Sequence, residues 1–115
     1  MKKLYLILFF TSLYCQPLDV TFRYVKNLTD DFDRVYVPGT MPSGTINDWG
    51  PNSNGIIEPN APSQMIYNEY SDSFEKYYSL MVGEQYLYKI HFHYNNSGTN
   101  YAWISDPLNP LTTND

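Results

Sequence analysis

The sequence predicts an all-β domain built as a β-sandwich. Short runs of alternating apolar and polar residues recur along the chain, and clusters of Pro, Gly, Asn, Asp and Ser separate them. No stretch after the N-terminal segment has the periodicity of an amphipathic helix. Several short strands at this spacing are typical of two packed antiparallel sheets, and a length of 115 residues suits one domain.

Residues 1–16 are predicted to be a secretory signal peptide. Lys2 and Lys3 precede an apolar run at 4–13, which is shorter than the roughly 20 residues that a transmembrane helix needs. We therefore expect a secreted, periplasmic or cell-surface protein whose mature domain is 17–115, with no membrane contact after cleavage. The alternatives to a signal peptide are a buried first strand or a lipid anchor on Cys15. A lipid anchor needs a small residue before the cysteine, and Tyr14 is large. Cleavage after Cys15, the only cysteine, would leave no disulfide.

The first mature strand is expected at 18–24, with Leu18, Val20, Phe22 and Tyr24 facing inward. Further strands are expected at 34–37, 64–67, 74–80, 86–92 and 101–104. The run 40–63 holds so many Pro and Gly residues that no regular element is predicted there. The strand 86–92 has the clearest alternation. Its predicted inward residues are Tyr86, Tyr88, Ile90 and Phe92, and its predicted outward residues are Leu87, Lys89, His91 and His93.

Charge narrows the range of ligands. Without Lys2 and Lys3 the mature part has five basic against twelve acidic residues, so its formal charge falls from −5 to −7. An acidic surface disfavours nucleic acid and anionic membranes, whose phosphates attract basic proteins. A neutral ligand such as a sugar is compatible with this charge. Twelve tyrosines are also more than a core of this size needs, so some are expected at the surface.

Three residues are candidates for sugar binding: Trp49, Lys89 and Trp103. An indole ring can stack on the weakly apolar C–H face of a sugar, and a few polar groups can then bind its hydroxyls. Trp49 lies in the long loop, Trp103 beside a turn, and Lys89 on an outward strand face. The simpler interpretation is that one tryptophan fills the core and that Lys89 is an ordinary solvated side chain.

Three segments resemble a known family. Residues 35–40 (VYVPGT) followed by 46–49 (INDW), residues 82–90 (VGEQYLYKI) and residues 103–110 (WISDPLNP) are similar, in the same order, to motifs of carbohydrate-binding module family 48. That family includes the glycogen-binding domain of the AMP-activated protein kinase beta subunit and the N-terminal domains of branching enzymes and isoamylases.

The resemblance implies an immunoglobulin-like β-sandwich of the early set type that binds α-1,4-linked glucans, as polysaccharide or maltooligosaccharide, without a cofactor. It implies that Trp49 and Trp103 stack on glucose rings and that Lys89 bonds sugar hydroxyls. Residues 41–45 resemble an insertion ahead of Trp49, and the family's downstream asparagine would fall beyond Asp115. The family's closing strand would also fall beyond Asp115, so we expect that the last strand is missing or that a downstream segment completes the domain.

Other chemistry finds less support in the sequence. His91 and His93 lack further metal ligands nearby and are expected to be an exposed pair, and Asp30, Asp31 and Asp33 are read as turn residues rather than calcium ligands. No motif singles out a catalytic pair among the carboxylates Glu69, Glu75, Glu84 and Asp106. The domain is therefore not expected to be an enzyme by itself. The alternatives are a non-binding module packed on a downstream glycoside hydrolase or esterase in the same gene, the N-terminal fragment of a glycoside hydrolase, or a protein-binding adhesion domain.

Overall fold

The computed structural model describes residues 16–42, 49–94 and 100–107, and within these ranges it contains strands and no helix. The eight strands are β1 (Pro17–Tyr24), β2 (Phe32–Tyr36), β3 (Asn52–Ser53), β4 (Ile56–Ile57), β5 (Ile66–Asn68), β6 (Ser73–Met81), β7 (Ile90–Tyr94) and β8 (Asn100–Ile104). The predicted signal peptide, except Gln16, and the predicted turn at 95–98 lie outside the described residues.

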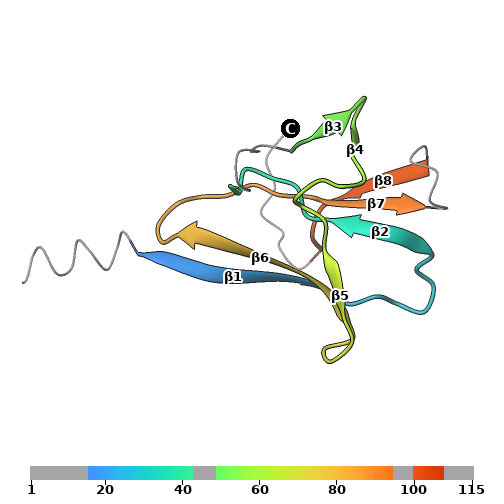
Figure 1. Cartoon of the computed structure of the whole chain (residues 1–115), viewed down its shortest axis with the longest axis horizontal. Coiled ribbons are helices and arrows are strands. Elements are labelled where there is room, and N and C mark those ends of the chain that lie inside the picture. The colour runs from blue at the N-terminus through green and yellow to red at the C-terminus, as the bar shows by residue number, and fades with distance from the viewer. Residues whose placement is uncertain (1–15, 43–48, 95–99, 108–115) are drawn as a thin grey trace, which may run out of the picture.

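Two three-stranded antiparallel sheets form the body of the domain (Figure 1). One has the order β1-β6-β5 and the other the order β2-β7-β8, and β3 and β4 pair separately as a small hairpin. β1 pairs with β6 over its whole length, from Pro17 opposite Met81 to Tyr24 opposite Phe74. The prediction of an all-β fold with two packed sheets is confirmed.

Aromatic side chains from both sheets make the core. Phe22 of β1 contacts Tyr88, and Tyr24 contacts both Phe32 and Phe92, each pair with ring centroids less than 6 Å apart and in edge-on geometry. Such pairs contribute about 0.5–1.5 kcal/mol beyond the burial of their area. The remaining buried members of this core are Val35, Val37, Met41, Met65, Tyr78, Leu80 and Ile90.

Most predicted strands are present, with three differences. The strand expected at 86–92 begins as a regular strand only at Ile90, because Tyr88 makes a single bridge to Gly39 instead of joining the sheet. Leu18 was expected to face inward but is 57% exposed, since it lies near the free end of β1. The loop at 40–63, expected to lack regular structure, contains the β3–β4 hairpin.

The hairpin has a local cause that sequence reasoning missed. Asn54 and Gly55, at its turn, both have positive φ, 55° and 80°. An Asn-Gly pair is the preferred sequence for a two-residue turn of this type, because both residues tolerate the left-handed conformation. The Asn-Gly pair is therefore the signal from which a hairpin could have been predicted here.

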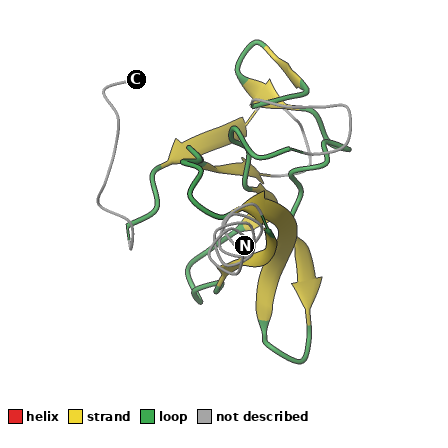
Figure 2. Ribbon diagram, turned by 90° about the vertical axis from the view of Figure 1, so that its left-hand side faces the viewer, coloured by secondary structure: helices red, strands yellow, loops and turns green. Residues whose placement is uncertain are grey.

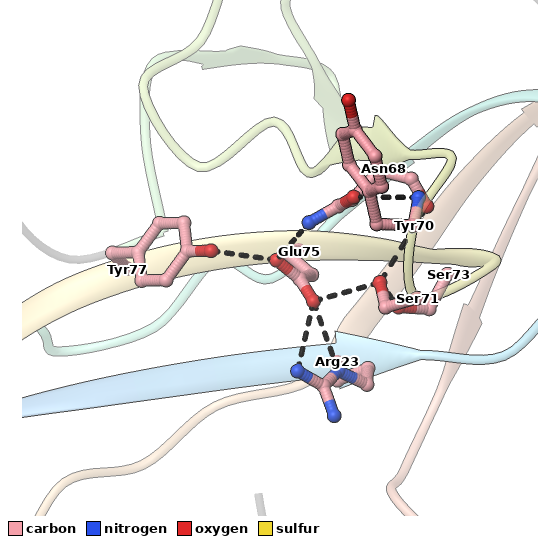
Figure 3. A network of polar contacts seen from close by, with 7 residues as sticks. All are labelled: Arg23, Asn68, Tyr70, Ser71, Ser73, Glu75 and Tyr77. Atoms are coloured by element: carbon pink, nitrogen blue, oxygen red, sulfur yellow. Dashed lines mark hydrogen bonds and ion pairs between the residues drawn. The ribbon is translucent and has the colours of Figure 1, made fainter.

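A polar network holds the sheet β1-β6-β5 together on its outer face (Figure 3). The Glu75 side chain, only 4% exposed, accepts hydrogen bonds from Tyr77, Asn68, Ser71 and Arg23, and the Arg23 guanidinium also lies 2.9 Å from it as an ion pair. These bonds, that of Tyr77 first, lower the pKa of Glu75 to about 2. Arg23 is on β1, Glu75 on β6 and Asn68 on β5, so one carboxylate links all three strands.

Candidate functional site

The sheet β2-β7-β8 is covered on both faces. Its inner face packs on the other sheet, and the hairpin segment 49–63 lies against its outer face, on the side away from β1 and β6 (Figures 1 and 2). Tyr36, Ile57 and Ala61 are buried there, and Trp103 packs against them. The Tyr36 hydroxyl donates to the Pro59 carbonyl at 3.0 Å, which ties the segment to β2.

This covering segment overturns the prediction that His91 and His93 are exposed. The two side chains are 0% and 1% exposed, and their rings lie 5.0 Å apart. They do point outward from the sandwich core, as predicted from the alternation of β7, but Ile57 and its neighbours bury that face. The error came from treating an outward strand face as a solvent-exposed one.

His91 makes the main polar contact between the sheet and the covering segment. The backbone N–H of Ile57 donates to Nε2 of His91 at 3.3 Å, so His91 acts as an acceptor and is neutral. Burial, and after it the neighbouring His93, together lower the pKa of His91 to about 4. Burial, followed by the positive charge of Arg34, also lowers the pKa of His93.

Trp103 lies on β8 directly opposite His91, with ring centroids 4.2 Å apart. Its indole N–H donates to the carbonyl oxygen of Gly55 at 2.8 Å, which fixes the ring against the turn of the β3–β4 hairpin. The side chain is partly buried, so the indole is neither a core residue nor a fully solvated one.

Trp49 meets Trp103 although the two are far apart in the sequence. Their ring centroids are 6.4 Å apart and their planes cross at 61°, and both side chains are partly exposed. The backbone N–H of Trp49 donates to the Gly39 carbonyl, and the backbone carbonyl of Trp49 accepts from the Asn52 side-chain amide. We call Trp49 and Trp103 the tryptophan pair.

The backbone at Trp49 is held in an uncommon conformation. Its φ is 60°, in the left-handed region that a bulky residue enters at a cost of about 1–2 kcal/mol. Strain of this kind persists where surrounding contacts fix the backbone, and it is found more often at functional sites than elsewhere.

Lys89 lies just before β7, in a segment that runs beside Pro38 and Gly39. The backbone N–H of Lys89 donates to the Pro38 carbonyl, and the adjacent Tyr88 forms a β-bridge with Gly39. The Gly39 carbonyl in turn accepts from the backbone N–H of Trp49. Tyr88 and Ile90 both face the core, so alternation places the partly buried Lys89 on the same outer face as His91. The three predicted site residues therefore come from neighbouring backbone segments.

Other predicted features fall outside this site. Asp30 accepts from the Tyr24 hydroxyl and the Asn27 N–H, as expected for a turn residue. Met41, at the start of the segment read as an insertion, is buried in the core, and residues 43–48 lie outside the described residues.

Two absences hold for the part of the chain that the structure describes. Residues 16–42, 49–94 and 100–107 contain no group of three or more His, Cys, Asp or Glu side chains placed to hold a metal ion. The same ranges contain no helix with the length and apolarity needed to cross a membrane.

No protein-family model, curated protein or solved structure matches this chain. The resemblance to carbohydrate-binding module family 48 accordingly stays a prediction.

Proposed function

We propose that the tryptophan pair binds a neutral α-1,4-linked glucan chain and that the domain does not catalyse a reaction by itself. The observation that carries this proposal is the meeting of two partly exposed indole rings on one surface, at an angle of 61°. Angled rings suit the curved path of an α-1,4-linked chain, whereas a straight chain such as cellulose suits rings in a flat row.

The surroundings of the pair support a neutral ligand. The indole faces carry no charge, and the chain as a whole is acidic, with a formal charge of −5. Lys89 is the cationic residue that the neighbouring backbone segment supplies to this face, and we propose that its ammonium group bonds sugar hydroxyls.

The tryptophan pair is also pre-organised. The Trp103 ring is fixed by its bond to Gly55 and its contact with His91, and the backbone that carries Trp49 is fixed by its bond to the Gly39 carbonyl. A surface whose aromatic rings are already ordered loses less conformational entropy when a ligand binds. The proposed setting is an immunoglobulin-like sandwich of the early set type, secreted or at the cell surface, as a module of a larger carbohydrate-active protein.

Affinity electrophoresis through gels that contain glycogen or amylopectin tests this proposal. The wild-type protein is expected to be retarded relative to a gel without polysaccharide, and Trp49→Ala is expected to lose at least ten-fold in affinity, about 1.4 kcal/mol. Tyr70→Ala is the matched control, because Tyr70 is a 94% exposed aromatic residue in the turn between β5 and β6 of the other sheet. Equal mobility of the wild type in gels with and without polysaccharide would refute the proposal.

A second candidate function is a non-binding structural module. The observation that favours it is that Trp103 already uses its N–H on Gly55 and one side of its ring on His91, contacts that serve folding without any ligand. In that case Trp49→Ala and the wild type would migrate identically at every glycogen concentration, while Trp103→Ala would lower stability.

A further inference from the structure

The two histidines beneath the tryptophan pair have an unusual hydrogen-bond environment. Both are fully buried, yet Nδ1 of His91 has no hydrogen-bond partner within the described residues, and His93 interacts only with the Ile57 backbone, too loosely for either ring nitrogen to form a well-shaped hydrogen bond. Buried polar atoms are nearly always partnered, so each exception calls for an explanation. These are also the only two histidines of the chain.

We propose that His91 and His93 form a pH-sensitive support for the tryptophan pair, so that acidification detaches the covering segment 49–63 and releases a bound glucan. This inference rests on the proposed function for its ligand, although the structural switch itself does not depend on that ligand.

Protonation would remove the contact that holds the segment in place. A neutral His91 accepts the Ile57 N–H through Nε2, whereas a protonated imidazole carries N–H groups on both nitrogens and can accept nothing. The Ile57 N–H would then face another donor in a buried site, and burying an unpartnered donor is costly.

The charges around the pair oppose protonation, and only the interaction of His93 with the Ile57 backbone favours it, which burial outweighs. The partner histidine lies 5.0 Å away, and Arg34, on β2, adds a positive charge on the side of His93. Tyr36, whose pKa burial raises, is neutral, and Tyr101 contacts His91 from β8 with ring centroids 5.6 Å apart. Glu58, the residue after Ile57 in the covering segment, is exposed, and it accepts a hydrogen bond from Ser53.

The size of the effect follows from linkage. The pKa of His91 is about 4 when segment 49–63 covers it and close to 6.5 when the segment is detached. Acid therefore shifts the equilibrium toward the detached form by up to about 300-fold. The contribution of neutral His91 to the covered form is complete above pH 6.5 and is lost as the pH falls toward 4.

Release of the segment would dismantle the tryptophan pair. Trp49 begins the segment, and Gly55, whose carbonyl fixes the Trp103 indole, lies at its hairpin turn. Ile57, the residue bonded to His91, is two positions after Gly55. Detaching this hairpin would therefore separate Trp49 from Trp103 and free the indole N–H.

Two measurements on the full chain test the switch without a sugar. A histidine NMR titration of the wild type is expected to give a pKa of 5 or below for His91. Tryptophan fluorescence is expected to change with a midpoint between pH 4 and 6, since both tryptophans of the chain belong to the pair. In the variant His91→Gln, whose amide oxygen can still accept from Ile57 but does not titrate, this transition should be reduced, because only His93 still titrates.

Binding of maltoheptaose by calorimetry adds the functional readout. The wild type is expected to bind at least ten-fold more weakly at pH 4.5 than at pH 7.5, and His91→Gln less than three-fold more weakly. If no sugar binds at either pH, the proposed ligand is wrong while the fluorescence and NMR results still decide the switch. A wild-type pKa near 6.5 for both histidines, or the same fluorescence transition in His91→Gln, would overturn the switch.

Discussion

Gly39 is the point where the tryptophan pair depends most directly on a single backbone contact. A Cβ atom added at Gly39 would overlap the Leu87 carbonyl oxygen and lie 2.9 Å from the Tyr88 Cα, both of which are backbone atoms. Neither can move aside as a side chain could, so the substitution Gly39→Ala must separate the two segments.

The expected loss of unfolding free energy in Gly39→Ala follows from the contacts on either side of Gly39. Overpacking alone costs about 1–3 kcal/mol. The hydrogen bonds from Thr40 to Leu87 and from Lys89 to Pro38 flank the contact at 2.9 and 3.1 Å. Each is worth about 1 kcal/mol net. We therefore expect Gly39→Ala to lower the free energy of unfolding by about 3–5 kcal/mol, a large part of the 5–15 kcal/mol typical of a domain.

Urea denaturation followed by tryptophan fluorescence and circular dichroism measures this loss. Gly83→Ala is the matched control, because Gly83 has open space around it and only its φ of 87° opposes a side chain, at about 1–2 kcal/mol. Because the Gly39 carbonyl accepts from Trp49, the native fluorescence of Gly39→Ala should also shift. A loss no greater than that of Gly83→Ala would refute the steric reasoning.

Three further predictions concern the covering segment and the Glu75 network. Ile57→Ala, at a fully buried site over His91, should cost about 2–4 kcal/mol in urea denaturation, and a loss below about 1 kcal/mol would mean that the segment does not pack as described. Trp103→Phe should lower the free energy of unfolding by about 1 kcal/mol more than the loss of ring area alone, since it removes the hydrogen bond to Gly55. A thermal unfolding curve that matches the wild type would contradict this. Because the pKa of Glu75 is lowered to about 2, the stability that its carboxylate contributes is present above pH 4.5 and is lost as the pH falls toward 2. Glu75→Gln should therefore flatten the acid-unfolding curve between these pH values. An unchanged slope would count against a stabilising role of the carboxylate.

Local patterns in the sequence were enough to predict the fold class. The alternation in 18–24, 74–80 and 101–104 corresponds to β1, β6 and β8, because period-two patterning reflects one buried sheet face and needs no knowledge of the partner strand. The excess of tyrosine also placed some rings at the surface, as Tyr70 and Tyr77 are. The immunoglobulin-like type and the glucan ligand stay predictions.

Part of the candidate site could be predicted and part could not. Residue types and a family resemblance predict Trp49, Lys89 and Trp103, whereas the alternation of the strand wrongly predicts that His91 is exposed to solvent. Its burial depends on Ile57, which reaches it across 34 positions of the chain. The Asn54-Gly55 turn could have predicted the hairpin, although not the face on which it packs.

The sequence by itself determined that this chain forms strands, which strand residues alternate between two faces, and that aromatic rings outnumber the needs of a core. Only the tertiary structure decided that the outer face of β2-β7-β8 is covered, that two histidines are buried beneath it, and that Trp49 meets Trp103. The physical reason is that alternation and turn preferences depend on neighbouring residues, whereas the position of a long loop is decided by contacts between segments far apart in the chain.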